Sequence, residues 1–168
     1  MPDKEILVVY YSRTGYTKKV AQDLAQRLGA DTEEIRDLSD RSGFIGYLKA
    51  VRAAMKEIPA ENAPASAKPG NYKLLVIGTP VWAWNMTPAV RAYLAMNTGK
   101  LPKVAFFTTF GGSGHEKTVR LMEELSGKKA EASAGFRQRQ IGKSPAYEAQ
   151  LDTFVETLIG TTTITAAK

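Results

Sequence analysis

The sequence predicts a single α/β domain built on a parallel sheet with helices on both faces. Short runs of β-branched and aromatic residues alternate with longer segments in which apolar residues recur at helical spacing. This alternation is typical of a doubly wound sheet, because parallel strands need crossover helices between them. The length of 168 residues suits one domain with a sizeable core. The predicted domain covers residues 1–160, and residues 161–168 are predicted to form a flexible tail.

The first strand and the first helix have the clearest patterns. Residues 5–12 (EILVVYYS) form a continuous apolar run of the kind found in strands buried on both faces. Val20, Leu24 and Leu28 then recur at helical spacing, and Gly29 fits a C-terminal helix cap. These two segments predict the first strand–helix unit of the sheet.

The remaining elements continue the alternation. Strands are predicted at 32–36, 72–79, 103–109 and 132–141, and helices at 87–96, 116–125 and 145–159. The unusual loops of the sequence each follow a strand. Because ligands bind beyond the carboxyl ends of parallel strands, this placement favours a single binding site.

A further helix is predicted within residues 43–58. Its apolar residues are spaced by four, three and four, and they comprise Phe44, Leu48, Val51 and Met55. Basic residues (Lys49, Arg52 and Lys56) occupy other positions around the helix. The favoured interpretation is a helix that covers the sheet, and the alternative is a lid or a basic docking surface. Residues 59–70, rich in Ala, Pro and Gly, are predicted to connect this helix to the next strand.

The composition excludes several kinds of site. The chain has no cysteine, which rules out disulfides, thiolate metal sites and cysteine nucleophiles, and its one histidine leaves little scope for a histidine-rich metal site. No apolar run approaches the roughly 20 residues that span a bilayer. The first five residues carry both charges and do not resemble a signal peptide, so a cytoplasmic location is expected.

The chain is basic, with a net charge of +6. This charge favours acidic protein partners, anionic ligands or nucleic acid. The basic residues are scattered, however, and no dense Lys/Arg tract interleaved with aromatic residues occurs. We therefore expect no specific nucleic-acid binding.

The loop after the first strand has the composition of a phosphate site. In Ser12-Arg13-Thr14-Gly15-Tyr16-Thr17, three hydroxyls surround a glycine directly before a helix. Backbone N–H groups at a helix N-terminus, together with hydroxyl donors, suit the acceptor oxygens of a phosphate. The loop lacks both the Gly-Lys-Ser/Thr ending of a P-loop and the three-glycine dinucleotide fingerprint. Taken alone, it is also compatible with a simple helix cap.

Two further loops suit a planar ligand. Residues 78–88 (GTPVWAWNMTP) contain Trp82 and Trp84, whose indoles could stack on a flat ring or fill the space between loop and helix. Residues 108–115 (TTFGGSGH) contain three glycines that expose backbone amides, although a flexible turn is the alternative. We interpret His115 as a surface residue at a helix start rather than as a proton donor.

Together these loops resemble the flavodoxin family. The first has the form Ser/Thr-x-Thr-Gly-x-Thr of the family's phosphate loop, and the other two match its ring-flanking loops in order and separation. The resemblance covers essentially the whole chain and implies five parallel strands in the order 2-1-3-4-5 with bound FMN. The phosphate contacts that it implies are Ser12, Arg13, Thr14, Gly15, Tyr16 and Thr17. The implied ring contacts are Pro80, Val81, Trp82, Ala83, Trp84 and Asn85, with Thr109, Phe110, Gly111, Gly112, Ser113 and Gly114, and Trp82 is expected to stack.

Two features depart from the electron-carrier members of that family. Those proteins are strongly acidic, whereas this chain is basic, which implies a different set of partners. Many of them also have a glycine beside the flavin N5, where a peptide flip occurs. No glycine lies between Thr79 and Pro88, so a flip there would involve Ala83, Trp84 or Asn85, of which Asn best tolerates the left-handed region. We therefore expect weak stabilisation of the one-electron-reduced flavin and a leaning toward two-electron chemistry.

The resemblance implies an FMN-dependent redox protein that transfers electrons between a reduced donor and a protein or small quinone-type acceptor. The flavin would supply the chemistry, so no catalytic side chain is predicted. An NAD(P)H-dependent quinone reductase and an electron carrier both remain open, as does the oligomeric state. The alternative is a non-redox domain that binds another phosphorylated ligand on the same fold. A phospho-acceptor receiver domain is disfavoured, because the first strand ends without clustered acidic residues.

Overall fold

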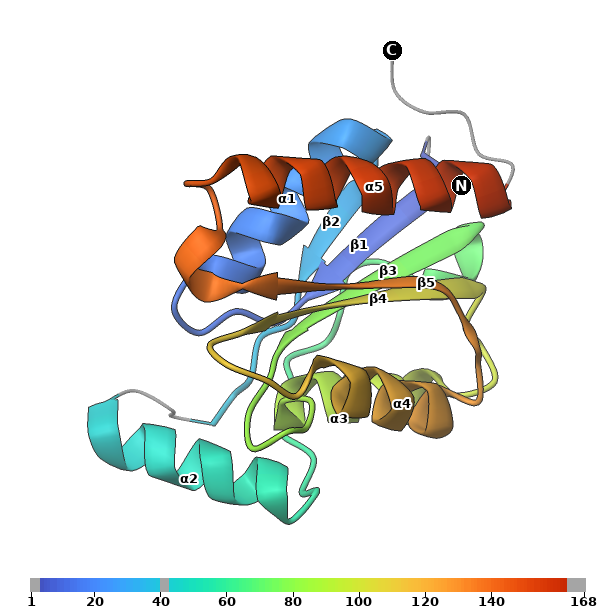
Figure 1. The fold of residues 1–168 in the computed structure, drawn as a ribbon. Helices are drawn as coiled ribbons and strands as arrows, with labels where there is room; N and C mark the ends of the chain where they lie inside the picture. The colour runs from blue at the N-terminus through green and yellow to red at the C-terminus, as the bar shows by residue number, and fades with distance from the viewer. Residues whose placement is uncertain (1–3, 40–42, 163–168) are drawn as a thin grey trace.

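A five-stranded parallel sheet lies between layers of helices (Figure 1). The computed structural model describes residues 4–39 and 43–162. The strands are β1 Ile6–Tyr10, β2 Asp31–Glu34, β3 Leu74–Pro80, β4 Lys103–Phe110 and β5 Ala130–Arg137. Their order across the sheet is β2-β1-β3-β4-β5, and every neighbouring pair is parallel, which confirms the predicted topology.

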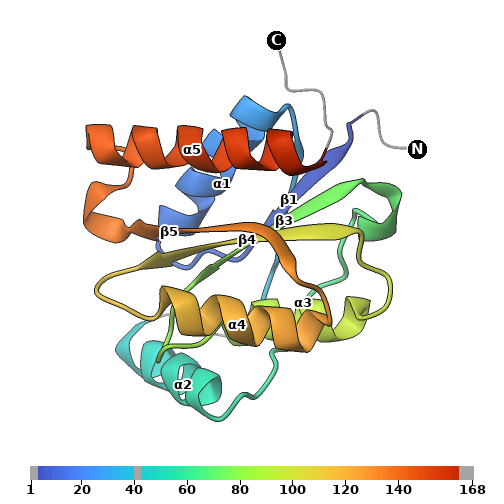
Figure 2. The ribbon, with the colours of Figure 1, turned by 45° about the vertical axis from the view of Figure 1, so that its right-hand side comes forward.

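Helices connect the strands in the predicted alternation. They are α1 Tyr16–Leu28, α2 Gly43–Met55, α3 Pro88–Asn97, α4 His115–Ser126 and α5 Pro145–Thr162. Short 3₁₀ turns occur at Pro69–Asn71 and Gln138–Gln140. In Figures 1 and 2, α1 and α5 cover one face of the sheet, and α3 and α4 cover the other.

Some boundaries differ from the predicted ones. The second strand begins at Asp31 and ends at Glu34, because the chain then leaves the sheet edge. The last strand ends at Arg137, where the 3₁₀ turn begins, rather than at residue 141. Helix α5 continues to Thr162, so the first two residues of the predicted tail are helical. Residues 163–168 lie outside the described residues.

The central strands are buried because alternate side chains enter two separate cores. Ile6 and Val8 of β1 pack into the core beneath α1 and α5, whereas Leu7 and Val9 pack into the core beneath α3 and α4. All five residues of β1 are buried, as the continuous apolar run predicts. The sheet is therefore a rigid base from which the loops at its carboxyl edge project.

Helices α1 and α5 pack side by side on the first face. The buried face of α1 includes Val20 and Leu24, in agreement with the predicted helical spacing. The Tyr147 hydroxyl of α5 donates a hydrogen bond to Asp23 Oδ2 of α1 at 2.6 Å. Burial, with a further contribution from Asp23, raises the pKa of Tyr147, so its phenol stays protonated. This bond fixes α5 against the helix that follows the first loop.

Helix α2 does not lie on the sheet face, contrary to the favoured prediction. It lies outside the layer of α3 and α4, beyond the carboxyl ends of the strands (Figures 1 and 2). Among the described side chains of this helix, those of Ala50 and Ala54 are buried, and their small size allows its backbone to approach its neighbours closely. Leu48 and Met55 of the predicted stripe are 50% and 67% exposed. Val51 of the stripe is half-buried, and the side chain of Phe44 lies outside the described part of the structure. The prediction was therefore wrong for Leu48 and Met55, because it considered only large apolar residues.

Candidate functional site

The loop between β1 and α1 leaves the N-terminus of α1 open. Gly15 occupies the position before the helix with φ of 98°, a left-handed conformation that glycine adopts readily. Its N–H donates to Ser12 Oγ at 3.1 Å, which folds the loop back on itself. Among the described residues, no side chain caps the helix. The first-turn amides and the positive end of the helix dipole thus face the loop, as a phosphate site requires.

The buried residue of this loop is Thr17. It is 1% exposed, and its hydroxyl forms a 2.8 Å hydrogen bond with the hydroxyl of Thr109 at the end of β4. Thr14, in contrast, is exposed at the loop tip, as are Arg13 and Gly15. The three hydroxyls of the predicted motif therefore differ in role, because Thr17 joins the first loop to the third while Thr14 is open to a ligand.

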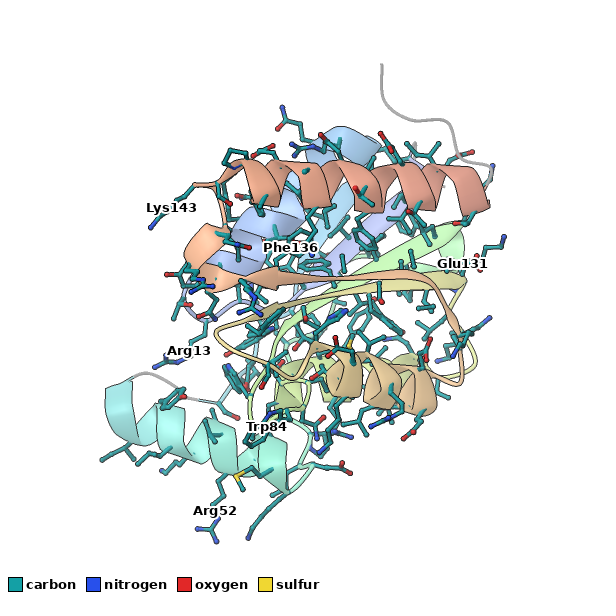
Figure 3. The ribbon with its side chains drawn as sticks, in the orientation of Figure 1. Arg13, Arg52, Trp84, Glu131, Phe136 and Lys143 are labelled. Carbon is teal, nitrogen blue, oxygen red and sulfur yellow. The ribbon has the colours of Figure 1, made fainter. Side chains whose placement is uncertain are left out.

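Arg13 extends from the same loop toward α2 (Figure 3). Its Nη2 donates to the Gly43 carbonyl oxygen at 3.4 Å, and its guanidinium lies 5.3 Å from the ring centroid of Tyr47. These contacts connect the first loop to the N-terminal half of α2. Sequence analysis did not identify Tyr47, because this residue lies off the predicted apolar stripe.

The loop after β3 makes a tight two-residue turn with a strained backbone. Trp82 and Asn85 exchange backbone hydrogen bonds of 2.9 and 3.0 Å, which closes the turn around Ala83 and Trp84. Both central residues have positive φ, 51° and 57°, as in a type I′ turn. Non-glycine residues reach this region at a cost of about 1 kcal/mol or more each, and such strain is often found at functional sites. The residues in the left-handed region are thus Ala83 and Trp84. The sequence analysis favoured Asn85 instead, because asparagine tolerates this backbone conformation best.

The two tryptophans of this loop have different environments. Trp82 is 8% exposed and packs edge-on against Tyr11, with ring centroids 5.7 Å apart. Trp84 is 59% exposed, and its Nε1 donates to Ser113 Oγ of the third loop at 3.2 Å. Trp82 was expected to stack on the ligand, but the structure places it in the core. Trp84 is therefore the indole that is available to a planar ligand.

Asn85 anchors the turn rather than facing outward. It is 5% exposed, and its Oδ1 accepts hydrogen bonds from Met86 N and Arg91 Nη2, both at 2.8 Å. Its Nδ2 donates to the Ala54 carbonyl oxygen of α2 at 3.3 Å. The side chain therefore ties this loop to both α3 and α2. Pro80, at the end of β3, is also buried, and Val81 and Ala83 are half-buried.

The third loop approaches the second one closely at a glycine. Gly114 has φ of 108°, and a Cβ there would lie 2.8 Å from Val81 Cγ1 and 3.1 Å from Trp84 Cδ1. Thr109 is buried and Phe110 half-buried, whereas Gly111, Gly112 and Ser113 are exposed. Gly114 is therefore required both for its backbone conformation and for the packing of the two loops.

Two of the helix N-termini at this edge are open, and a third is closed. Like α1, α4 starts after a left-handed glycine, and within the described residues no side chain caps it. Helix α3 is instead capped by Thr87, directly before its first residue, whose hydroxyl accepts a hydrogen bond from Val90 N at 3.4 Å. The open N-termini are those that follow the first and third loops, where ligand contacts are predicted.

His115 begins α4 and is half-buried. Its Nδ1 lies 2.9 Å from Thr108 Oγ1, and its ring stacks on Phe110 with 6.3 Å between centroids. Burial lowers the pKa of His115, so the imidazole is neutral at pH 7. It begins the helix as predicted, but it supports the third loop from behind rather than lying on the surface.

A cavity of about 630 Å³ borders the outer side of the third loop. Its lining includes Ser113, His115, Arg137 and Gln150, and it extends along β5 toward α5. It lies on the β5 side of the loop rather than among all three loops. Within residues 4–39 and 43–162, no cluster of three or more His, Asp or Glu side chains could hold a metal ion.

Comparison with known proteins assigns the chain to a family. A sequence model of the flavodoxin family matches residues 5–157. The chain belongs to the flavodoxin family. No curated protein sequence matches it. In the part of the chain that the structure describes, no helix is long and apolar enough to cross a membrane.

Solved structures share the flavodoxin-like fold. A flavoprotein from Lactobacillus acidophilus NCFM, solved in complex with FMN, aligns with a TM-score of 0.71 and 22% identity over 90% of this chain and 98% of that chain. A candidate flavoprotein from Bacteroides uniformis aligns with a TM-score of 0.75 and 18% identity, covering 92% and 99% of the two chains. Rubredoxin oxygen:oxidoreductase from Desulfovibrio gigas aligns over 96% of this chain but only 37% of its own, with a TM-score of 0.62 and 17% identity. At these identities the likeness shows the fold alone.

Proposed function

We propose that this flavodoxin-family chain binds FMN at the carboxyl edge of its sheet and acts as a redox protein. The observation that carries the proposal is the strained turn that presents Trp84. Two consecutive non-glycine residues in the left-handed region hold an indole that is 59% exposed against the glycine-rich third loop. Strain of this kind, next to an exposed aromatic ring, supports a planar ligand.

The phosphate end of FMN fits the first loop. The uncapped N-terminus of α1 offers backbone donors, and Ser12 and Thr14 add hydroxyls beside it. Arg13 contributes a positive charge at the loop tip. Ser12, Arg13, Thr14, Gly15 and the first-turn amides of Tyr16 and Thr17 would hold the phosphate. The side chain of Thr17 would act indirectly, since it is bonded to Thr109.

The ring end fits the second and third loops. Trp84 would cover the isoalloxazine, and the exposed backbone of Gly111, Gly112 and Ser113 would bind its polar edge. Val81 and Ala83 would contribute apolar contacts, while Pro80, Trp82, Asn85, Thr109, Phe110 and Gly114 would shape the loops from behind. When bound, FMN supplies one- or two-electron redox chemistry, and the protein orients the ring and excludes water.

The electrons would pass between a reduced donor and a protein or quinone-type acceptor. An exposed ring site suits an electron carrier or a simple quinone reductase, with NAD(P)H as a candidate donor of the latter.

The proposal is tested by titrating FMN and riboflavin into apoprotein and following the quenching of flavin fluorescence. We expect FMN to bind more tightly than riboflavin. Thr14→Ala should weaken FMN about fivefold and leave riboflavin unchanged, because one hydrogen bond to a charged phosphate is lost. Trp84→Ala should weaken both ligands. Failure of the wild-type chain to bind FMN would overturn the proposal and favour another phosphorylated ligand.

A further inference from the structure

Helix α2 exposes apolar side chains on the face turned away from the protein. Ile45, Leu48 and Met55 are 69%, 50% and 67% exposed. At 3.6 residues per turn, these residues share the side of the helix opposite Ala50 and Ala54, which are buried. The exposed positions therefore form a continuous outward face rather than scattered surface residues.

The same outward face is strongly basic. Lys49, Arg52 and Lys56 are all exposed, and no acidic residue occurs from Gly43 to Lys56. Arg52 points away from the protein in Figure 3. The nearby carboxylate of Glu57 lies 3.9 Å from Arg91, on α3. The face thus carries exposed apolar side chains and positive charges together.

Both halves of α2 are connected to the proposed FMN site. Near its N-terminus, Arg13 of the first loop bonds to the Gly43 carbonyl oxygen and lies over the Tyr47 ring. Near its C-terminus, Asn85 of the second loop donates to the Ala54 carbonyl oxygen. A protein bound to the outward face of α2 would therefore lie beside the loops that hold the ring.

We propose that the outward face of α2, formed by Ile45, Leu48, Lys49, Arg52, Met55 and Lys56, docks a redox partner protein whose surface carries acidic and apolar side chains. This inference rests on the proposed function and names the chemistry of the partner. Apolar contacts at the centre of an interface provide affinity, and complementary charge at its rim steers association. The net charge of +6 adds long-range attraction for an acidic partner.

Two other occupants fit the face less well. A second copy of the chain in a symmetric dimer would bring the cations of α2 against the same cations of its partner. A lipid surface would bury Arg52, which lies on the helix between Leu48 and Met55 rather than on a separate polar face. Charge complementarity therefore favours an acidic protein.

The experiment measures electron transfer from a reduced acidic [2Fe–2S] ferredoxin to the FMN-loaded protein by stopped flow. The variant Lys49→Gln/Arg52→Gln/Lys56→Gln removes the three charges of the face. The control variant Lys100→Gln/Lys103→Gln/Lys128→Gln removes three exposed charges at the amino edge of the sheet. At low ionic strength, we expect the α2 variant to slow the second-order rate about tenfold and the control to slow it less than about twofold. The difference should vanish at high salt.

A second variant tests the apolar side chains of the face. Leu48→Ala/Met55→Ala trims two exposed side chains, so folding should be unaffected. We expect about fivefold weaker ferredoxin binding, measured by calorimetry, with an unchanged dependence on salt. Basic cytochrome c serves as the opposite-charge probe, and its reduction rate should not fall in the α2 charge variant.

Equal ferredoxin rates for the α2 and control charge variants, with normal FMN binding, would overturn the docking surface alone. Failure to bind FMN would overturn the proposed function, and calorimetry with apoprotein would still test the surface. The wild-type protein could co-sediment with phosphatidylglycerol vesicles, and the α2 charge variant could lose this binding while its ferredoxin binding is unchanged. That result would overturn the protein-docking proposal in favour of a lipid. A dimer that Leu48→Ala/Met55→Ala dissociates would overturn it in favour of a second copy.

Discussion

Ala83 and Trp84 adopt a left-handed backbone conformation that glycine or asparagine usually occupies. Both have positive φ, and the hydrogen bonds between Trp82 and Asn85 hold them there. The adjacent Asn85 side chain is fully engaged with its neighbours, so the turn is fixed from both sides. The strain is therefore maintained by surrounding structure, and relieving it has a measurable effect.

Ala83→Gly should stabilise the apoprotein by about 1 kcal/mol, because glycine adopts a φ of 51° without the steric cost that a Cβ imposes. The measurement is urea unfolding followed by circular dichroism. Ala149→Gly, at an exposed position within α5, is the control and should destabilise by about 1 kcal/mol. Destabilisation by both substitutions would show that the turn is not strained.

Gly114→Ala should destabilise the protein by about 2 kcal/mol, because the new methyl group would meet Val81 at 2.8 Å in a left-handed conformation. Gly112→Ala is the matched control in the same loop, since nothing lies within 4 Å of its added Cβ. Differential scanning calorimetry of the two variants provides the comparison. Equal melting temperatures would contradict the close packing of the second and third loops.

At the residue scale, the sequence identified the three loops but not the roles of residues within them. Hydroxyls, indoles and glycines are visible in a pattern, so the loops could be located. Which tryptophan is buried depends on Tyr11, which directly follows the neighbouring strand β1, and that contact has no signature in the loop itself. The same holds for Thr17, whose partner Thr109 is 92 residues away.

Strands and helices were predictable where the side chains on their buried face are large and apolar. The spacing of Val20 and Leu24 correctly predicts the buried face of α1. Helix α2 buries Ala50 and Ala54 instead, because small residues permit a close approach that a stripe of large residues does not reveal. Leu48 and Met55 were therefore predicted to be buried but are exposed, and both belong to the face proposed for docking.

The hydrogen bond between α5 and α1 should contribute to the stability of the fold. Tyr147→Phe removes the 2.6 Å hydrogen bond to Asp23 and should destabilise the fold by about 1.5 kcal/mol, as expected for a bond to a charged acceptor. The free energy of unfolding in urea measures this loss. Tyr72→Phe, which breaks a 2.9 Å bond from a more exposed phenol to Asp31, should have a smaller effect. A larger loss for Tyr72→Phe would reverse the assigned importance of the two contacts.

At the scale of the whole molecule, buried phenols link stability to alkaline pH. Burial, with a contribution from Glu34, raises the pKa of Tyr10 to about 12, and burial with Asp31 raises the pKa of Tyr72 to about 12. Burial raises the pKa of Tyr93 and Tyr147 as well. The native state therefore favours protonated phenols over the unfolded state, whose tyrosines titrate near 10.

We expect the contribution of these phenols to the free energy of unfolding to be constant just below pH 10. The free energy of unfolding should then fall steeply as pH rises from 10 through about 12. The sign follows because the unfolded state releases these protons first. Urea midpoints measured across this range, with tyrosinate absorbance recorded in parallel, check the prediction. Tyr10→Phe should make the decline shallower, and an unchanged decline would exclude Tyr10 as a contributor.

The hydrogen bond between Thr17 and Thr109 has a consequence for the molecule as a whole. It joins the first turn of α1, directly after the loop that follows β1, to the end of β4, across the intervening strand β3. The two ends of an elongated ligand would therefore meet partners whose separation is already set, and little conformational entropy would be lost when they bind. Such preorganisation makes the affinity for the intact ligand exceed what its separated fragments would achieve, because the first fragment does not have to order the subsite of the second.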